Sequence, residues 1–394
     1  MSTLKFRKPR LPSHYYIWFE PPDDSGEEVL HFVSERRRIK LKGHSFREFQ
    51  QHVIPLLDGR HTLEEIEHKV EGVFEPRDLE AGLRLLADQN LIEDSDEQTT
   101  PAGLIDRLAP QLNFFHEMGA KSHELQARLS NATVTIFGLG GAGASAAFSL
   151  AASGVGTLRC VDALNVVPAD VYLSPVFCSS DVGRQRASAA ARRIEASSPQ
   201  VKVQTFTQSL ESDADVLAAV EGSDFIINCL DPGQSSAAYK LNRVCLKLDI
   251  AWTSCLLNGA EVAVGPTVRP YETACYLCYK MRTVACAGNP EDEFAFERHL
   301  DRRKQDDSAR RENVVFGAGI AANLISLEAV KHLSGFFPTS TVGKLLIFDL
   351  LELTSTKHVV LRKPWCPACF KPQTEAKAVD QAPSVSAKST QDGK

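Results

Sequence analysis

A cluster of glycines follows an apolar, β-branched stretch near the middle of the chain. Val134–Phe137 predicts a strand, and an alanine-rich segment that predicts a helix follows Gly138, Gly140, Gly141 and Gly143. Because glycine has no Cβ, backbone N–H groups in such a turn can approach a phosphate, and the helix start adds unpaired donors and a positive dipole end. The order of strand, glycines and helix predicts a nucleotide-binding turn, or a similar turn kept only for tight strand–helix packing.

Acidic residues end two further predicted strands. Asp162 ends the first of these, about twenty residues after the glycines, where a carboxylate can hydrogen-bond ribose hydroxyls. Asp231 ends the apolar run 224–231. In an open α/β sheet an acid at this end of a strand faces the ligand crevice, so Asp231 is a candidate metal–phosphate ligand. Its alternative role is to cap a helix.

The spacing of the cysteines predicts a metal site. Cys275 and Cys278 form one C-x-x-C pair, and Cys366 and Cys369 form a second. Two such pairs can present four sulfurs to a zinc ion in a tetrahedron, which leaves no open position, so the metal would be structural. A redox couple and unrelated buried thiols are the alternatives.

The segment 282–313 is dense in charge and contains Cys286. It predicts either a mobile loop over the crevice or a solvated helix. The Cys286 thiol is either an acyl acceptor or a spectator, and no general base can be assigned to it.

The bulk composition excludes several classes of protein. The chain of 394 residues can form two or three domains, and its 43% hydrophobic and 24% charged content is typical of soluble proteins. A net charge of −6 argues against a general nucleic-acid binder. The chain has neither an apolar run of about 18 residues nor the apolar core of a signal peptide, so we expect a cytoplasmic protein without disulfides.

Residues 1–95 predict a small winged-helix-like α+β domain. Alternating stretches at Val29–Val33 and Arg38–Lys42 predict strands. Helices are predicted near Phe46–Leu57, after a capping box formed by Thr62 and Glu65, and over Asp78–Leu86.

The rest of the chain predicts a linker, an α/β domain and a tail. Residues 96–110 are polar and punctuated by proline, and 111–129 have helical spacing. From 134 onward, strands at 134–137, 158–162, 201–206, 224–229 and 250–255 alternate with helical segments. This alternation predicts a Rossmann-like, mostly parallel sheet with crossover helices. Residues 371–394 have the composition of a disordered tail.

The N-terminal segment resembles a known peptide-binding domain. The phrase Leu56–Ile66, with 79–93 after it, is similar to the PqqD-like leader-recognition domain. The resemblance implies that the leader of a ribosomally made precursor peptide adds as a strand to the sheet edge, between sheet and helix. The implied contact residues are Val29, Phe32, Val33, Ile39, Leu41, Leu79, Leu83 and Leu86. A dimerisation module is an alternative, and acids in the second helix disfavour a DNA-binding winged helix.

Residues 111–370 resemble the ThiF/MoeB/HesA superfamily of adenylating enzymes, which are related to ubiquitin-activating enzymes. The matching phrases are the glycine loop, Gly154–Leu158, Asp181–Gly183, Cys229–Asp231, both C-x-x-C pairs and Gly317–Gly335. The resemblance implies a dimer that binds ATP·Mg and adenylates a peptide carboxylate. It assigns the glycines to phosphate, Asp162 to ribose and Asp231 to magnesium, and it matches Arg186 to a family lysine.

The chain departs from this family at three positions. Leu164 stands where the family has an acid, and Asp170 and Leu173 stand where it has asparagine and arginine. Losing a group that stabilises the transition state typically costs about 2.7–4 kcal/mol. We therefore expect weakened ATP binding and adenylation.

The combination of the two domains resembles the cyclodehydratase-associated C proteins, also called ocin-ThiF-like proteins, of thiazole/oxazole-modified peptide pathways. It implies a component that binds the leader and presents the core peptide to a YcaO-type, ATP-dependent cyclodehydratase, which forms thiazolines and oxazolines. The alternative is an active adenylating enzyme that acts on a peptide carboxylate. A redox protein that uses NAD fits poorly, because the glycine and cysteine phrases both match the superfamily.

Overall fold

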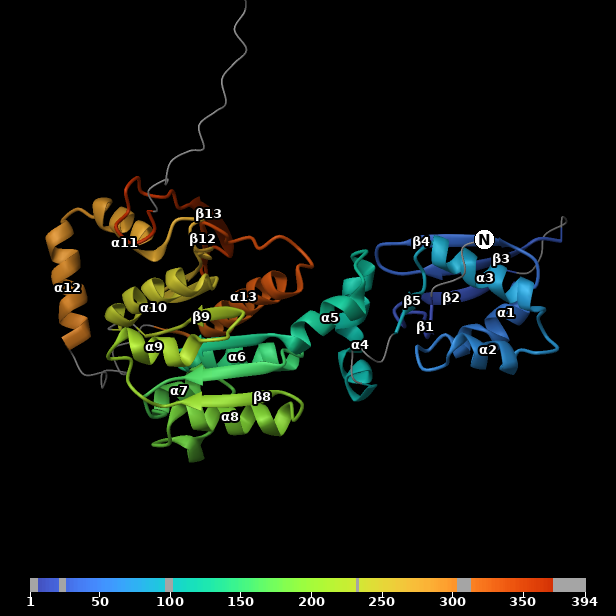
Figure 1. Ribbon diagram of the computed structural model, residues 1–394, viewed down its shortest axis with the longest axis horizontal. Helices are drawn as coiled ribbons and strands as arrows, with labels where there is room; N and C mark the ends of the chain where they lie inside the picture. The colour runs from blue at the N-terminus through green and yellow to red at the C-terminus, as the bar shows by residue number, and fades with distance from the viewer. Residues whose placement is uncertain (1–5, 21–25, 96–101, 232–233, 303–312, 371–394) are drawn as a thin grey trace, which may run out of the picture.

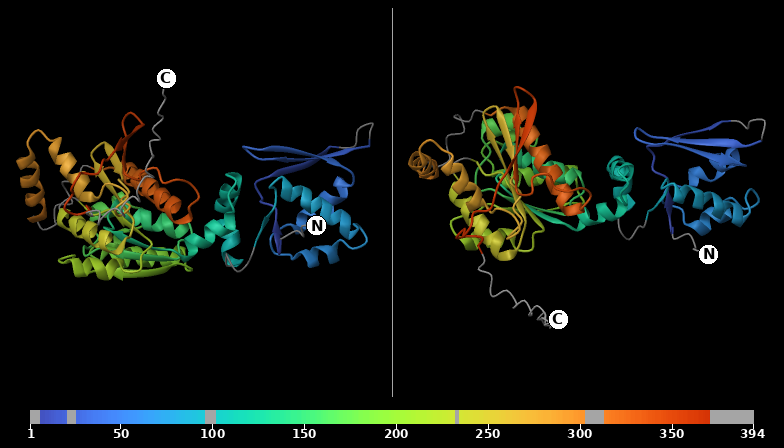
Figure 2. Two further views of the ribbon diagram at one scale, coloured as in Figure 1. Left: turned by 45° about the horizontal axis from the view of Figure 1, so that its top comes forward. Right: turned by 90° about the horizontal axis from the view of Figure 1, so that it is seen from above.

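The chain folds into two units joined by a pair of helices (Figure 1). The structure, a computed structural model, describes residues 6–20, 26–95, 102–231, 234–302 and 313–370. Helices α4 (Ala102–Glu117) and α5 (Ser122–Asn131) lie between the small N-terminal unit and the larger unit, as two further views also show (Figure 2). Part of the expected linker, from Ala102 onward, is therefore helical, and Pro110 lies inside α4.

The N-terminal unit contains a three-stranded antiparallel sheet. Its strands are β2 (Tyr16–Glu20), β3 (Glu28–Val33) and β4 (Arg38–Gly43), in the order β2-β3-β4. The two predicted strands are confirmed as β3 and β4, whereas β2 was missed because its apolar run lacks the polar alternation of a half-buried strand. The sequence predicts the peptide-binding sheet edge near Val29–Val33 and Arg38–Lys42. Since β3 is paired on both sides, Val29–Val33 is not an edge, whereas Arg38–Lys42 lies in β4, which with β2 forms the edges of this sheet.

Helices cover one face of this sheet. They are α1 (Phe46–His52), the 3₁₀ turn η1 (Ile54–Leu56), α2 (Leu63–Lys69) and α3 (Pro76–Asp88), which confirm the three predicted helices. Thr62 and Glu65 form the predicted capping box. The core includes Leu30, Phe32 and Leu41 from the sheet. A short ribbon of β1 (Pro9–Arg10) and β5 (Glu93–Asp94) closes the unit.

The larger unit is built on an eight-stranded mixed sheet with the order β13-β12-β11-β10-β9-β6-β7-β8. The strands are β6 (Thr133–Phe137), β7 (Thr157–Val161), β8 (Lys202–Phe206), β9 (Phe225–Asn228), β10 (Trp252–Asn258), β11 (Glu261–Val264), β12 (Lys344–Asp349) and β13 (Thr354–Val359). The first five of these confirm the predicted strands and are parallel. Strands β11 to β13 extend the sheet in antiparallel fashion. The predicted Rossmann-like α/β fold is confirmed.

Helices pack on both faces of this sheet. Helices α6 (Gly141–Ala152), α8 (Arg186–Ser197) and α13 (Val315–Ser334) share one core, and α9 (Asp213–Val220) and α10 (Ser235–Leu248) share another. The remaining elements are α7 (Pro168–Leu173), the turn η2 (Ser179–Asp181), α11 (Tyr276–Ala285) and α12 (Pro290–Arg302). In the described part of the chain, none of the helices has the length and apolar character needed to cross a membrane.

Candidate functional site

The glycine turn joins β6 to α6, as the sequence predicted. Gly140 is the N-cap of α6, and Gly138 has a φ of +78°, which favours glycine. A Cβ on Gly138 would lie 2.5 Å from the carbonyl oxygen of Cys229, and one on Gly143 would lie 1.8 Å from that of Gly138. Glycine is therefore required at both positions for the backbone to close.

Asp162 follows β7 and is buried beside the turn. Its Oδ2 accepts a hydrogen bond from the Leu139 backbone N–H at 2.7 Å, and its Oδ1 accepts one from Leu164 N–H at 2.8 Å. Burial raises the pKa of Asp162, while nearby Arg186 and these two hydrogen bonds oppose that rise. Asp162 thus fixes the glycine turn against the loop after β7, in addition to the ribose contact that the family resemblance predicts.

Arg186 lies at the centre of a buried cluster with three aspartates. Its Nε and Nη2 each donate to one oxygen of Asp170 at 2.8 Å, and its Nη1 lies 3.1 Å from Asp231 Oδ2 and 3.6 Å from Asp162 Oδ2. Burial disfavours the charge on Arg186, but the carboxylates of Asp231, Asp162 and Asp170 more than offset this and raise its pKa. The guanidinium is 2% exposed. Its charge is therefore balanced by carboxylates of the same chain.

The three positions that depart from the family pattern have distinct places in the structure. Asp170 is 1% exposed and also accepts the backbone N–H of Val167 at 2.9 Å, which anchors the start of α7. Leu173 is buried against Gly141. Leu164 contributes the N–H that bonds Asp162. Asp170 thus contributes to an internal ion pair, and Leu173 makes an apolar contact.

Two cavities flank Leu230, just before Asp231. The larger, about 220 Å³, is lined by Asp162, Lys240 and Asp301, among others. The smaller, about 40 Å³, is lined by Gly140, Gly141 and Asp231, and no lysine or arginine is among its lining residues in the described part of the chain. Asp162, Arg186 and Asp231, which the sequence predicts as nucleotide-site residues, lie together beside the glycine turn at one end of the sheet.

Several residues of this region were missed by sequence reasoning. Lys240 donates its Nζ to the Leu210 carbonyl at 2.8 Å, and Asp301 of α12 accepts the backbone N–H groups of Ser235 and Ser236 at the start of α10. These contacts join segments far apart in the sequence, and no local motif marks them.

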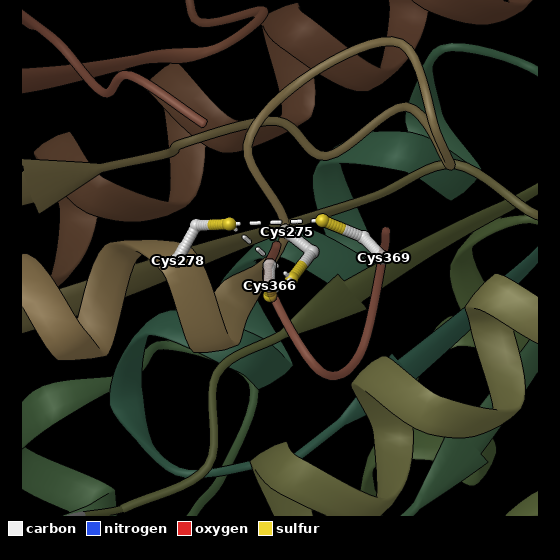
Figure 3. A group of neighbouring side chains, drawn as sticks. All are labelled: Cys275, Cys278, Cys366 and Cys369. Carbon is white, nitrogen blue, oxygen red and sulfur yellow. Dashed lines mark hydrogen bonds between the residues drawn. The ribbon is translucent and has the colours of Figure 1, made fainter. Parts of the chain in front are cut away.

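Four cysteines form a buried cluster at the other predicted site (Figure 3). Cys275 and Cys278 lie at the start of α11, and Cys366 and Cys369 lie in the turn after β13. The Sγ–Sγ distances are 3.9 Å for Cys275–Cys278, 3.8 Å for Cys275–Cys366 and 3.6 Å for Cys278–Cys369. A tetrahedral zinc with Zn–S bonds of about 2.3 Å needs sulfurs about 3.8 Å apart. The donor set fits a metal such as zinc.

The charged segment 282–313 begins in α11 and, after a turn at 286–289, forms a second helix. Helix α12 covers Pro290–Arg302, so the prediction of a helix is confirmed there, and 303–312 lie outside the described residues. Cys286 is the exposed C-cap of α11.

The predicted peptide-contact residues divide into two groups. Phe32, Leu41, Leu79, Leu83 and Leu86 are buried in the core of the N-terminal unit, while Val29, Val33 and Ile39 are half-buried. The prediction that the first five present side chains to a peptide is wrong, because the hydrophobic periodicity that marked them is the signature of the domain's own core. A peptide can instead reach the exposed backbone of β4.

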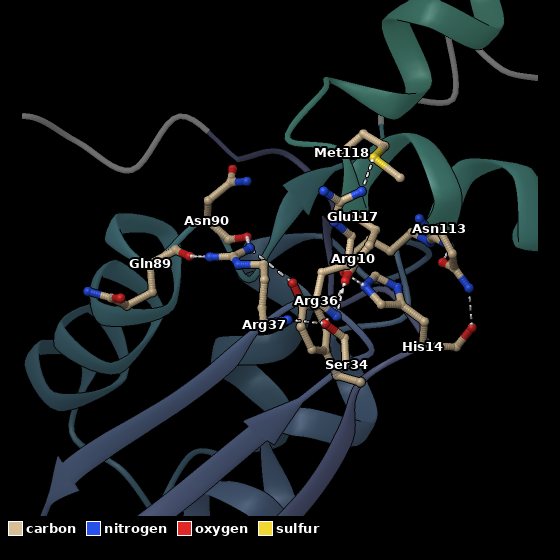
Figure 4. Close-up of polar contacts among 12 residues, drawn as sticks. Arg10, His14, Ser34, Arg36, Arg37, Gln89, Asn90, Asn113, Glu117 and Met118 are labelled. Atoms are coloured by element: carbon tan, nitrogen blue, oxygen red, sulfur yellow. Dashed lines mark hydrogen bonds and ion pairs between the residues drawn. The ribbon is translucent and has the colours of Figure 1, made fainter. Parts of the chain in front are cut away.

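The turn between β3 and β4 contacts both α3 and α4 (Figure 4). Arg37 donates to the carbonyls of Gln89 and Asn90 at the end of α3. On the other side, Glu117 of α4 accepts hydrogen bonds from Ser34 Oγ at 2.7 Å and from the Arg36 backbone N–H at 3.0 Å. The turn that begins β4 is thus fixed to the end of α3 and to α4, and α4 leads to the larger unit.

Comparisons with known proteins agree with this geometry. The model of the ThiF family matches residues 108–368. The sulfur carrier protein ThiS adenylyltransferase of Escherichia coli (strain K12) is 26% identical over 249 residues, covering 62% of this chain and 88% of that protein. The heterocyst HesA protein of Trichormus variabilis is 28% identical over 246 residues, covering 62% and 82%.

Solved structures share the fold across both units. The E. coli MccB structure with ATP has a TM-score of 0.61 at 16% identity, covering 92% of this chain and 99% of that chain. The microcin C7 biosynthetic enzyme MccB in complex with N-formylated MccA has a TM-score of 0.62 at 17% identity, with the same coverage. PaaA has a TM-score of 0.60 at 21% identity, covering 89% and 99%.

Proposed function

Because the chain belongs to the ThiF family, we propose that it is a precursor-peptide-binding component of a ribosomal peptide modification system, derived from an adenylating enzyme. Residues 1–95 bind the leader peptide, and 111–370 form a scaffold that presents the core peptide to a YcaO-type cyclodehydratase. That partner would use ATP to form thiazolines and oxazolines.

The ion pairs of Arg186 carry this proposal. An adenylating site must offset the charge of a triphosphate, whereas the charge of Arg186 is already balanced by three nearby carboxylates, two of which accept its hydrogen bonds. To bring Arg186 to a triphosphate, the site would have to break its buried bidentate pair with Asp170 and place a phosphate beside that carboxylate. Both steps oppose nucleotide binding.

The N-terminal unit supports the peptide-binding role. MccB, which shares the fold over both units, was solved with the peptide MccA bound. The β4 edge offers unpaired backbone groups, which are the groups that strand addition uses.

Exposed apolar side chains on the larger unit support further protein contacts. Phe316 of α13 is 76% exposed, and Leu351 and Leu353, between β12 and β13, are 80% and 71% exposed. Apolar groups of this size on a surface are typical of protein–protein interfaces. We assign this surface to the expected homodimer or to the cyclodehydratase.

The four cysteines would hold the structural zinc of the family. When bound, the ion would crosslink α11 to the chain after β13 and supply no catalytic chemistry, because four thiolates complete its coordination.

Calorimetry of the full chain with the precursor peptide encoded nearest to its gene tests the proposal. We expect binding whose affinity is the same with and without ATP·Mg. Absence of any binding would overturn the leader-recognition role.

The second candidate function is adenylation of a peptide carboxylate, with ATP·Mg at Gly138–Gly143, Asp162 and Asp231. The observation that favours it is the larger cavity, which lies beside Asp162 and contains Lys240. ATP–pyrophosphate exchange distinguishes the two functions, since only an adenylating enzyme catalyses it.

A further inference from the structure

The hydrogen-bonding pattern of β4 determines which backbone groups face its free edge. At the hairpin turn, Ser34 N–H donates to the Arg37 carbonyl at 2.9 Å, so Ser34 and Arg37 form a hydrogen-bonded pair. Such pairs alternate with non-bonded pairs along an antiparallel ladder. Ile39 and Leu41, paired with Phe32 and Leu30, therefore bond to β3. The N–H and C=O groups of Arg38, Lys40 and Lys42 consequently point to the free edge.

The same three residues carry positive side chains on one face of the sheet. Arg38, Lys40 and Lys42 are exposed, whereas Leu41 is buried and Ile39 half-buried on the opposite, helix-covered face. Alternate residues of a strand are about 6.8 Å apart and share a face. The free edge thus presents a cation at every second position.

Two nearby carboxylates, those of Glu20 and Glu28, are engaged elsewhere. Glu20 lies 3.1 Å from His31 Nε2, and Glu28 accepts the backbone N–H groups of Phe46 and Arg47 at the start of α1. Within the ranges that the structure describes, no ion pair involves Arg38, Lys40 or Lys42. Their charge is available to a partner.

We infer that the peptide bound at β4 is acidic, with aspartate or glutamate at every second residue over the paired segment. In a strand added to this edge, residues opposite Arg38, Lys40 and Lys42 share their face, with Cβ atoms about 4.5–5.5 Å away. The intervening peptide residues lie on the face of Ile39 and Leu41 and are apolar. This inference rests on the proposed leader-binding function and specifies the chemistry of its ligand.

Lysines on an edge strand have an alternative role, in which they bind no peptide and only block edge-to-edge aggregation. The two roles differ in their response to peptide charge. A blocking role gives no preference for an acidic strand, whereas recognition requires one.

Fluorescence anisotropy of the full chain with synthetic peptides tests the inference. The first probe alternates glutamate and leucine, the second has the same composition with its glutamates contiguous, and the third alternates lysine and leucine. We expect the first to bind roughly tenfold more tightly than either other probe, because three exposed ion pairs of modest strength act together. Raised salt should weaken this preference.

Charge reversal at the edge provides the matched comparison. The triple variant Arg38→Glu/Lys40→Glu/Lys42→Glu should reverse the preference between the glutamate and lysine probes. Lys357→Glu, on the edge strand β13 of the other sheet, should leave it unchanged. Lys40→Ala serves if the triple variant does not fold, and it should reduce the preference.

Two results would overturn the inference, and they are distinguishable. If the precursor peptide binds but the probes and charge variants show no dependence on acidic residues, the leader-binding function stands and the acidic specificity fails. If neither the precursor peptide nor any probe binds, the leader-binding function fails as well.

Discussion

Asp170 and Arg186 form a bidentate ion pair inside the larger unit, with both carboxylate oxygens 2.8 Å from guanidinium nitrogens. Both side chains are at most 2% exposed. The family phrase has asparagine at the position of Asp170, so a single change from amide to carboxylate allows this pair to form. The pair makes Arg186 part of the protein's internal structure.

Asp170→Asn should destabilise the protein. Removing one partner of a buried pair leaves Arg186 less compensated and typically costs about 3–5 kcal/mol. Urea unfolding measures the change. Asp213→Asn breaks an exposed pair with Arg243 and should cost less than about 1 kcal/mol. Equal effects of the two variants would contradict a structural role for the buried pair.

Restoring the family residues should restore nucleotide affinity. In Asp170→Asn/Leu173→Arg, Arg186 loses a carboxylate and the cavity gains a cation, so we expect ATP·Mg to bind at least about tenfold more tightly than to the native chain. Equilibrium dialysis measures this. Leu173→Arg alone is the control, because Asp170 remains to neutralise the new charge, and it should gain less.

The fold was predicted well where local patterns and tertiary structure agree. The parallel strands, the capping box of Thr62 and Glu65 and the paired cysteines all carry signals within a few residues. Strand β2 was missed because its consecutive aromatic and aliphatic residues carry no period.

The candidate site was predicted only in part, because its residues carry local signals but the contacts between them do not. Gly138, Asp162 and Asp231 were each found at strand ends, where sheet topology brings ligand-binding residues together, whereas Arg186 was found only through the family resemblance. Their mutual ion pairs could not be predicted, because Asp170 and Arg186 are brought together only by the fold, in which α7 and α8 both pack against α6. The peptide-contact residues were misassigned because periodicity marks buried positions, whether they face a core or a ligand.

Cys366→Ser should release the metal and destabilise the larger unit. Metal analysis should find about one zinc per native chain and much less in the variant, with a lower melting temperature. Cys286→Ser, at the exposed end of α11, should retain both metal and stability. A zinc-free native chain of full stability would contradict the metal assignment.

Stability should fall as the pH is lowered from 6.5 towards 4, partly because of His116. Burial, with His14, Arg10 and Arg37 nearby, lowers the pKa of His116 from 6.5 to about 4. Between these values the unfolded state binds more protons, so acid favours unfolding, by about 2 kcal/mol at pH 5 for this group.

His116→Phe should therefore lose less stability than the native chain between pH 7.5 and pH 5. Urea unfolding at both values measures the difference. His68→Phe, at an exposed position of α2, should keep the native pH dependence. Identical pH dependence in native protein and His116→Phe would rule out this contribution.

Lys40→Pro should abolish leader binding while the fold is kept. Proline removes the N–H that faces the free edge, where it bonds no other strand. Ile39→Pro instead removes an N–H bonded to β3 and should destabilise the N-terminal unit. Calorimetry with the precursor peptide, alongside circular dichroism, separates the two effects. Undiminished binding by a folded Lys40→Pro would exclude strand addition at β4.

ATP–pyrophosphate exchange by the full, zinc-loaded chain tests the central claim most directly. With the precursor peptide present, we predict no exchange above the level without protein, because Arg186 is held by Asp162, Asp170 and Asp231. Peptide-dependent exchange that Asp231→Asn abolishes would contradict the account and establish an active adenylating enzyme.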